Sequence, residues 1–335
     1  MTQETMQALV MTAFGRLELH TLPVPELVRP DDVLLGVRAA GVCGSDLHGY
    51  TGATGRRTPP LVMGHEATGR VLRVGEGVTS LEPGARVALM PLLIEGGRRR
   101  LLGMDAPGAY ATHVVWPAGR LFPLPDGVSD DAGAFAEPLA VALHALGVSR
   151  TLTPTYESAF VAGAGTIGLL IASVLLGSGV GTVVVSDVSE ARLRVARALG
   201  VTRTLNPAHE DGPGVVRELT GGVGVDVSFE AVGVTETVGQ SVAFVRDGGT
   251  VVWVGNNRRV VEVDMQAVVT RELRVLGSYG LNDRDFGEAL SWLAEGRVET
   301  QTLTSRRAPL RGSEGLFDEL LGSPETIKCL IDPSL

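Results

Sequence analysis

Cysteine is scarce in this chain of 335 residues, which contains only Cys43 and Cys329. Two cysteines cannot build a disulfide framework, and such scarcity is typical of proteins from a reducing compartment. The first ten residues also lack the basic and apolar segments of a signal peptide. We therefore expect a cytoplasmic protein.

An excess of basic residues is missing as well, because the net charge is −9. Binding to nucleic-acid phosphates needs clustered lysines and arginines, and the only basic run, Arg98 to Arg100, is more simply a solvated loop. The composition therefore argues against a nucleic-acid partner.

Charged residues are absent between Glu157 and Asp187, and this stretch is long enough to suggest a membrane span. Its internal order favours a different structure. An apolar strand enters a glycine turn over 159–168, a helical run covers 169–176, and a second strand covers 182–187. We expect a buried strand–helix–strand unit and no membrane partner.

The chain is too long for one ordinary core, and its 44% hydrophobic content is enough for two. Short strands punctuated by prolines dominate residues 1–150, whereas strands and helices alternate over 151–282. Such alternation predicts a doubly wound parallel sheet, so the fold class is α/β. An amphipathic helix over 285–298 and a closing strand over 328–335 follow.

A glycine fingerprint lies inside the strand–helix–strand unit. Gly163, Gly165 and Gly168 follow the G-x-G-x-x-G pattern between strand and helix, where glycines allow a tight turn and close approach of a pyrophosphate. The first residues of the helix, Thr166 and Ile167, would then present their N–H groups to the phosphates. We predict a dinucleotide site here.

Asp187 ends the second strand about twenty residues after Gly168, which is the spacing expected for a carboxylate that binds ribose hydroxyls. A carboxylate there repels a 2′-phosphate, so NAD is favoured over NADP. Arg192 and Arg194 leave the alternative open, because a nearby arginine can accommodate the phosphate; otherwise they belong to a solvated helix face.

A dense group of reactive side chains lies between Gly41 and Gly69. A thiolate, an imidazole and a carboxylate together suit zinc, and this stretch offers all three. The alternative is that Cys43 is a small buried apolar residue and the others lie near a turn. The reactive residues are Cys43, Ser45, Asp46, His48, His65 and Glu66.

This stretch resembles the zinc-dependent medium-chain dehydrogenase/reductase family (the alcohol dehydrogenase superfamily), and most closely its sorbitol or polyol dehydrogenase-like branch. The C-G-S-D-x-H run of that branch spans Cys43 to His48. The family's long zinc signature, GHE-x2-G-x5-G-x2-V, is met by Gly64, His65, Glu66, Gly69, Gly75 and Val78.

The resemblance implies a metal site and a proton path. Zinc would bind the substrate oxygen and stabilise the alkoxide, which passes hydride to the nicotinamide. Ser45 would accept the proton and pass it through the cofactor ribose to His48, while Asp46 orients His65. The implied metal ligands are Cys43, His65, Glu66 and Glu137, and either glutamate can be the direct ligand. We also count Glu66 among the catalytic residues.

Glu137 matches the position where the polyol branch places a glutamate at or beside the metal. A charged residue in so apolar a segment would be costly without a partner, although an exposed glutamate at a helix start is the alternative. His144 is expected to be a hydrogen-bonded core histidine and His113 a strand or pocket-wall residue, and neither is assigned to the metal.

The sequence also departs from its relatives. Many of them hold a structural zinc with four cysteines, but the corresponding segment here, 90–115, has none, so we predict one catalytic zinc per chain and a short loop in place of the lobe. The polyol branch commonly has an aromatic residue followed by arginine after the last cofactor-domain strand. Here Tyr279 is followed by Gly280, which puts sorbitol itself in doubt.

The resemblance further implies the domain plan: a GroES-like catalytic domain over 1–150, a Rossmann domain over 151–282 and a return to the catalytic domain over 283–335. The cofactor would lie in the cleft between domains, with Val232 and Val254 near the nicotinamide. Relatives pair through the edge of the cofactor-domain sheet, so we expect a homo-oligomer, a dimer or a tetramer, and segment 248–255 is apolar enough to be that edge.

Three functions compete. The first is a zinc- and NAD-dependent dehydrogenase acting on a secondary alcohol, polyol or cyclitol and its ketone. The second is a zinc-free, NADPH-dependent quinone or enoyl reductase of the same superfamily. The third is a non-catalytic NAD-binding regulatory protein. The ligand set and the Ser45/His48 pair favour the first.

Overall fold

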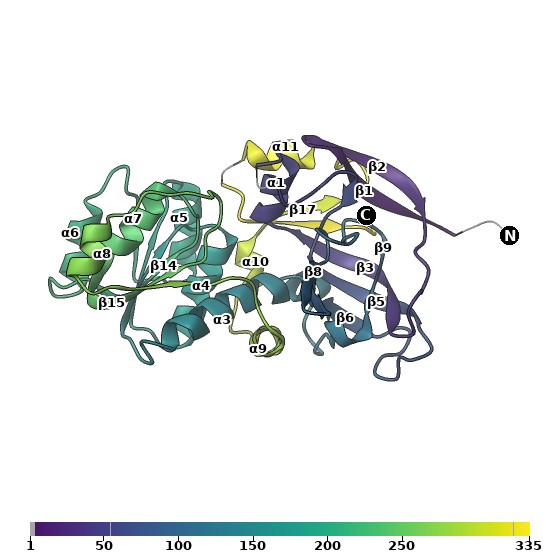
Figure 1. Ribbon diagram of the computed structural model, residues 1–335, viewed down its shortest axis with the longest axis horizontal. Coiled ribbons are helices and arrows are strands. Elements are labelled where there is room, and N and C mark those ends of the chain that lie inside the picture. The colour runs from purple at the N-terminus through teal and green to yellow at the C-terminus, as the bar shows by residue number, and fades with distance from the viewer. Residues whose placement is uncertain (1–3, 54, 324) are drawn as a thin grey trace. The chain divides into compact units, whose positions relative to one another are not determined.

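The computed structural model describes residues 4–53, 55–323 and 325–335. The chain forms two compact units, each of which is described by itself (Figure 1). The first unit contains the chain up to Glu137 together with Leu293–Glu295 and Thr304–Leu335, and the second contains Pro138–Trp292 and Gly296–Leu303. These divisions differ from the boundaries expected at 150 and 283, because helices α3 (Ala136–Arg150) and α9 (Asp283–Ala294) lie almost wholly in the second unit.

The first unit is built mainly from β-strands. One sheet has the order β10-β6-β5-β3-β18-β17, with β9 also paired to β3, and a second has the order β2-β1-β4. Their strands are β1 (Thr5–Ala13), β2 (Arg16–Pro23), β3 (Asp32–Val42), β4 (Leu61–Val62), β5 (Glu66–Val74), β6 (Arg86–Leu89), β9 (His113–Pro117), β10 (Leu121–Pro123), β17 (Thr304–Pro309) and β18 (Lys328–Asp332).

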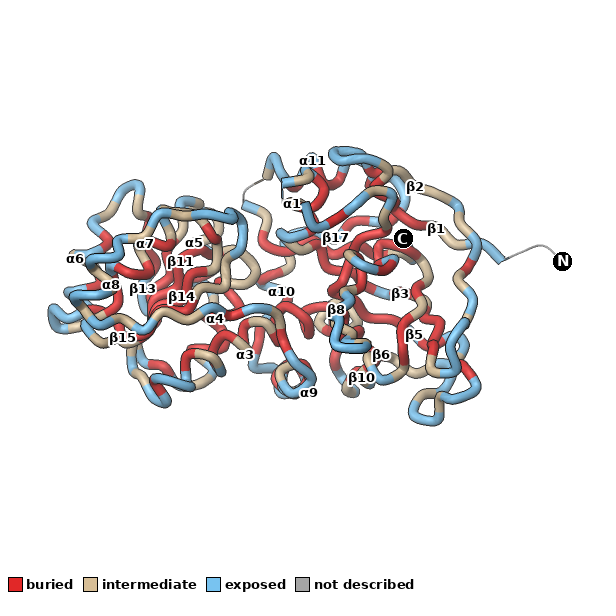
Figure 2. Tube along the Cα trace, viewed as in Figure 1, coloured by how far each residue is buried: buried red, intermediate tan, exposed pale blue. Residues whose placement is uncertain are grey.

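A buried apolar core holds these sheets together (Figure 2). Its aromatic centre includes Tyr110 and Phe317, whose rings meet edge to face with centroids 5.9 Å apart. The helical elements of this unit are short: α1 (Gly44–Tyr50), η1 (Ala118–Arg120), α2 (Asp130–Gly133) and α11 (Leu316–Leu321). The C-terminal strand β18 lies between β17 and β3, which confirms the predicted closing strand.

The second unit contains the predicted parallel sheet. Its strand order is β13-β12-β11-β14-β15-β16, and every pairing is parallel. The strands are β11 (Ser158–Ala162), β12 (Thr182–Ser186), β13 (Arg203–Leu205), β14 (Val225–Glu230), β15 (Val245–Trp253) and β16 (Arg274–Gly277). The helices, besides α3 and α9, are α4 (Thr166–Gly177), α5 (Glu190–Ala198), α6 (Gly212–Leu219), α7 (Thr235–Phe244), α8 (Met265–Thr270) and α10 (Thr300–Leu303).

The strand–helix–strand prediction is confirmed. Strand β11 pairs in parallel with β12, and α4 connects them with eight consecutive residues, Gly168 to Leu175, buried. Among the described residues, the stretch Asp130–Arg150 is long and apolar enough to cross a membrane by composition alone, but 72% of its apolar 18-residue window is buried inside the fold. The apolar segments of this chain therefore serve as core.

Two sequence-based expectations are wrong. The segment expected to be a short loop in place of a zinc lobe forms an antiparallel hairpin of β7 (Leu92–Glu95) and β8 (Arg98–Leu101). Segment 248–255 is not a sheet edge, because its strand β15 lies between β14 and β16. The free edge at that end of the sheet is β16. This strand has only four residues, which is too few for its hydrophobic pattern to identify it as an edge strand.

Candidate metal centre and dinucleotide loop

The register of two neighbouring strands brings the candidate metal ligands together. Strand β3 runs up to Val42, Cys43 is the N-cap residue of α1, and β5 begins at Glu66. The two strands are antiparallel and pair Gly41 with Glu66. A Cβ at position 41 would clash with the Glu66 carboxylate, so only glycine fits beside it.

Cys43, His65 and Glu66 form the cluster. One ligand atom from each lies within 4.8 Å of the others, and His65 and Glu66 are buried. Both cysteines are free thiols, so Cys43 is available as a ligand. A thiol, an imidazole and a carboxylate at such distances are a donor set that suits zinc.

The two oxygens of the Glu66 carboxylate lie in different environments. Its Oε2 accepts a hydrogen bond of 2.6 Å from the ammonium group of Lys328, which also donates to the Val42 carbonyl oxygen at 3.2 Å. Its Oε1 is buried without a hydrogen-bond partner among the described residues. A buried carboxylate oxygen without a donor is costly, and a metal ion beside His65 would satisfy it, so the residues fit a zinc ion.

Lys328 is buried on β18, with 2% of its surface exposed. Burial favours the neutral amine, but Glu66, Cys43 and Glu137 together outweigh burial and raise the pKa of Lys328. The lysine therefore stays charged and compensates one carboxylate of the cluster.

A second buried network supports His65 from the other side. Asp46 Oδ1 lies 3.4 Å from His65 Nδ1 and accepts a hydrogen bond of 2.7 Å from Arg57. The Tyr110 hydroxyl donates to Asp46 Oδ2 at 2.6 Å. Because His65 turns Nδ1 toward Asp46, the other ring nitrogen is left for a metal.

Electrostatics fix the charges of this network. Burial opposes ionisation of Asp46, but the nearby His65 and Arg57 outweigh it and lower its pKa. Burial likewise disfavours the imidazolium form of His65, yet Asp46 raises the pKa of the imidazole well above its ordinary value. A metal must therefore displace a proton to bind His65, and its binding should weaken as the pH falls.

Glu137 is buried near the cluster but lies outside the group of three ligand atoms. Burial, with a contribution from Glu66, raises the pKa of Glu137 to about 7, although His65 and Lys328 act in the opposite direction. This carboxyl group is thus close enough to sense the cluster. The alternative of an exposed glutamate at a helix start is wrong.

Ser45 and His48 lie on α1, directly after Cys43. Ser45 is exposed and His48 is partly buried. Burial and the charge of Arg57 both lower the pKa of His48, so its imidazole is neutral near neutral pH and able to accept a proton.

The glycine loop of the second unit has the geometry of a phosphate cradle. A side chain at Gly168 would clash with the Gly163 carbonyl oxygen, and Gly163 itself has φ +100°. A Cβ at Gly165 would meet nothing within 4 Å, so open space lies in front of the N-terminus of α4, where Thr166 and Ile167 begin the helix. Two glycines are needed by the fold and the third leaves room for an anion.

Asp187 lies directly after β12 and beside this loop. Its Oδ2 accepts a hydrogen bond of 2.8 Å from the Ala164 N–H, and its Oδ1 accepts one of 2.8 Å from the Ser189 N–H. Arg192 approaches the same carboxylate at 3.8 Å. The predicted ribose ligand is therefore held in a fixed orientation at the end of its strand.

Val232 and Val254 follow strands β14 and β15, and both loops are organised by Glu230. The Val232 N–H donates to Glu230 Oε1 at 2.8 Å, and the Val254 N–H donates to the Glu230 carbonyl oxygen at 2.9 Å. Glu230 is completely buried. No sequence-based prediction includes Glu230, although a carboxylate amid an apolar strand is a signal that could have found it.

Arg57, Tyr110 and Lys328 were also missed. Lys328 could have been found from the sequence, because it is a charged residue at the start of an apolar closing strand. Arg57 lies in a loop without periodicity, so no local pattern indicates its role. The histidines excluded from the site do lie elsewhere: His144 Nδ1 lies 2.7 Å from Asp285 Oδ2, and His113 is on β9.

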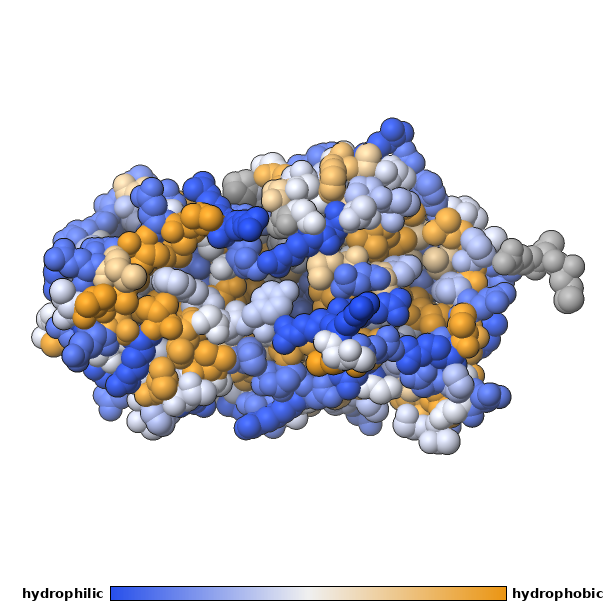
Figure 3. Space-filling model, in the orientation of Figure 1, coloured by the Kyte–Doolittle hydropathy of each residue, from blue (hydrophilic) through white to orange (hydrophobic). Residues whose placement is uncertain are grey.

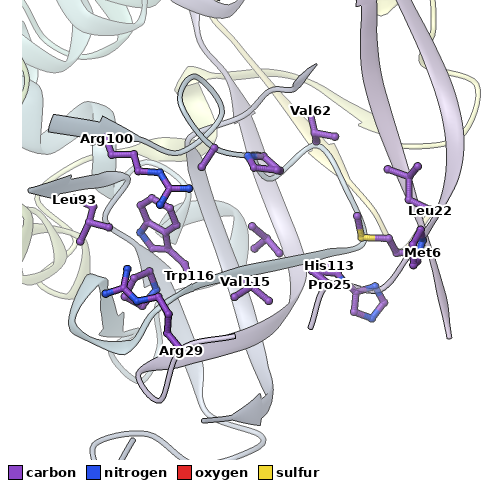
Figure 4. Close-up of a pocket in the computed structure, with 16 residues that line it drawn as sticks. Met6, Leu22, Pro25, Arg29, Val62, Leu93, Arg100, His113, Val115 and Trp116 are labelled. Carbon is purple, nitrogen blue, oxygen red and sulfur yellow. The ribbon is translucent and has the colours of Figure 1, made fainter. Parts of the chain in front are cut away.

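His113 also lines a separate cavity of about 420 Å³ in the first unit (Figure 4). The cavity is mainly apolar, and its wall includes Trp116 and several prolines together with Arg29 and Arg100. No candidate metal ligand belongs to its described lining, so it is distinct from the metal cluster.

We predict that Glu137 makes the chelator-treated protein less stable as the pH rises. Its pKa of about 7 exceeds the ordinary 4.5, so the folded chain binds more protons than the unfolded chain between these values, and the stability this provides is lost as the pH rises through 7. From pH 5.5 to pH 8, the free energy of unfolding should fall by about 2 kcal/mol more than in Glu137→Gln. Denaturant titrations at both pH values measure the difference, and parallel behaviour of the two proteins would contradict the assignment.

Comparison with known proteins gives consistent matches. Residues 29–126 match the alcohol dehydrogenase GroES-like domain, and residues 166–295 match the zinc-binding dehydrogenase family. The chain is 32% identical to D-xylulose reductase A of Aspergillus niger, over 96% of this chain and 95% of that protein. It is 29% identical to sorbitol dehydrogenase 1 of Saccharomyces cerevisiae, over 99% of both chains.

Solved structures agree with the sequence matches. A protein from Sinorhizobium meliloti, described as a zinc-binding dehydrogenase and bound to NADP, is 32% identical with a TM-score of 0.88, and the match covers 99% of this chain and 100% of that one. The 2R,3R-butanediol dehydrogenase of Bacillus subtilis is 30% identical with a TM-score of 0.90, over 98% and 99% of the chains. With these matches along its whole length, the chain belongs to the zinc-dependent medium-chain dehydrogenase/reductase family, in its polyol dehydrogenase branch.

Proposed function

We propose that this protein is a zinc-dependent oxidoreductase that transfers hydride between NAD(H) and a secondary alcohol or polyol and its ketone. The observation that carries the proposal is the convergence of Cys43, His65 and Glu66 within 4.8 Å, with one buried carboxylate oxygen left without a partner. The free thiol among these ligands suits a reducing, cytoplasmic setting.

Each residue has a defined task. Cys43, His65 and Glu66 would hold the ion, and Glu137 is near enough to exchange with Glu66 or to hold a water. Zinc, when bound, supplies Lewis-acid polarisation of the substrate oxygen. Ser45, exposed beside Cys43, takes the substrate proton, and the neutral His48 passes it on.

The substrate is proposed at the level of a chemical class. Relatives are named for xylulose, sorbitol and butanediol, which are ketones or alcohols with neighbouring oxygens. Tyr279 is 59% exposed after β16, but Gly280 replaces the arginine of the polyol branch. We therefore extend the proposal to secondary alcohols, polyols and cyclitols and do not select sorbitol.

NAD is proposed as the cofactor because Asp187 is fixed by two backbone N–H groups at the strand end. We infer that its carboxylate accepts hydrogen bonds from the ribose hydroxyls and repels a 2′-phosphate. Arg192, 3.8 Å away, is the residue that would accommodate a 2′-phosphate, and the relative from Sinorhizobium meliloti is bound to NADP.

Neither alternative function uses the metal cluster. A zinc-free NADPH-dependent reductase has no need for a thiol, an imidazole and a carboxylate at one point, nor for a lysine to balance their charge. A non-catalytic NAD-binding protein has no need for Ser45 and His48 beside them.

The test is turnover by protein purified without chelator. Xylitol, sorbitol and 2R,3R-butanediol are offered with NAD, and D-xylulose with NADH. We expect about one zinc per chain and turnover of at least one substrate, and Cys43→Ser should lose both while Cys329→Ala, which removes the other thiol, keeps them. Zinc-free protein that reduces quinones with NADPH would contradict the proposal, and zinc-loaded protein without turnover would favour the regulatory alternative.

The same assay tests the cofactor. NAD should be preferred to NADP, and Asp187→Ser should lower kcat/KM for NAD about 10–100-fold, as expected for hydrogen bonds to a charged group worth about 1.5–3 kcal/mol. An unchanged ratio of NAD to NADP activity in this variant would contradict the role of Asp187.

We also propose that the protein is a homo-oligomer that pairs through β16, the free edge of the parallel sheet. Apolar residues gather on the surface near α8 and β15 of the same unit (Figure 3), and Val260, Met265 and Val269 are all more than 60% exposed. Light scattering should give the mass of a dimer or a tetramer, and a monomer at micromolar concentration would contradict this.

A further inference from the structure

Arg57 is a buried arginine in the loop between α1 and β4, with 4% of its surface exposed. A guanidinium is always charged and is costly to bury, so arginines inside proteins are held by specific acceptors. The acceptors of Arg57 therefore indicate what the residue is for.

Its two terminal nitrogens bind the first turn of α1. Nη1 donates to the Ser45 carbonyl oxygen at 2.7 Å, and Nη2 donates to Asp46 Oδ1 at 2.7 Å. Nη2 also lies 3.3 Å from the Ser45 hydroxyl oxygen. One cation thus contacts both the hydroxyl proposed to take the substrate proton and the carboxylate that faces His65.

The surrounding chain makes room for this arrangement. A side chain at Gly49 would clash with the Arg57 side chain, so the glycine opens one face of α1 to the arginine. The remaining guanidinium nitrogen, Nε, is buried without a partner in the described part of the chain. The burial of this charged group with one donor unsatisfied is a cost that its contacts with Ser45 and Asp46 must offset.

We propose that Arg57 is a positioning residue for proton transfer: its guanidinium fixes the orientation of the Ser45 hydroxyl and holds Asp46 against His65. This inference rests on the proposed dehydrogenase function. A guanidinium can only donate, so the Ser45 hydrogen cannot point toward Arg57. One lone pair of the serine oxygen accepts from Nη2, and the other remains for the substrate.

In this orientation the Ser45 hydroxyl can relay a proton from the substrate. The substrate O–H bond breaks as a new O–H bond forms on the Ser45 oxygen, and the original serine proton leaves to the next acceptor, so the serine ends neutral. A serine that could rotate freely would present this lone pair only part of the time. The arginine thereby acts on the rate through Ser45 without touching the substrate.

The experiment compares Arg57→Met, Arg57→Lys and Arg57→Ala with Arg56→Met, which removes the exposed neighbouring arginine. Zinc per chain and thermal unfolding are measured first, followed by kcat, KM, and the solvent deuterium isotope effect on kcat. We expect Arg57→Met to retain zinc and the KM for NAD, to lose about 10–100-fold in kcat, and to show a larger solvent isotope effect. Arg57→Lys should restore part of the rate, guanidinium ion should restore part of it when added to Arg57→Ala, and Arg56→Met should match the parent.

Other outcomes would overturn the inference. An unchanged kcat in Arg57→Met would show that the serine needs no such support. Joint loss of zinc, fold and rate in the Arg57 variants, without rescue by guanidinium, would show a purely structural role. A parent protein that binds zinc but oxidises no alcohol overturns the proposed function and this inference together, whereas an active parent with unaffected variants overturns the inference alone.

Discussion

Three carboxylates can be buried beside the Cys43 thiol only because cations are buried with them. Lys328 pairs with Glu66 and Arg57 pairs with Asp46, both at hydrogen-bond distance. Removing one partner of such a buried pair typically costs about 3–5 kcal/mol, because the remaining charge loses its compensation. Because Arg57 and Lys328 are paired with Asp46 and Glu66, the Cys43 thiol and the Glu137 carboxyl group remain to offset the charge of a divalent ion.

This charge pairing depends on distant segments of the chain that meet in one unit. Lys328 reaches Glu66 only because β18, formed near the C-terminus, pairs with β3, and β3 in turn pairs with β5. The glycines of the zinc signature serve the same purpose: a Cβ at Gly64 would meet the Tyr110 ring, and one at Gly75 would meet the Pro30 carbonyl oxygen. The zinc signature therefore contains glycines that are required by close packing as well as the metal ligands themselves.

Local patterns predicted those parts of the fold and the site that depend on neighbouring residues. The strand–helix–strand unit, the glycine loop and Asp187 follow from spacing within about thirty residues, and the structure places them as expected. Cys43 and His65 could be predicted from the sequence for the same reason. The roles of Arg57 and Lys328 could not be predicted in this way, because they depend on pairing between residues that meet only in the folded chain. The edge strand of the parallel sheet, β16, could not be distinguished from β15 without the strand order.

The central claim is that one zinc ion is held by a single thiolate together with nitrogen and oxygen ligands. X-ray absorption at the zinc edge tests it most directly, on protein purified without chelator. The account predicts one sulfur at about 2.3 Å, with the remaining ligands nitrogen or oxygen at about 2.0–2.2 Å. A zinc shell without sulfur, or one with two sulfurs, would contradict the assignment of Cys43, His65 and a glutamate as the metal site.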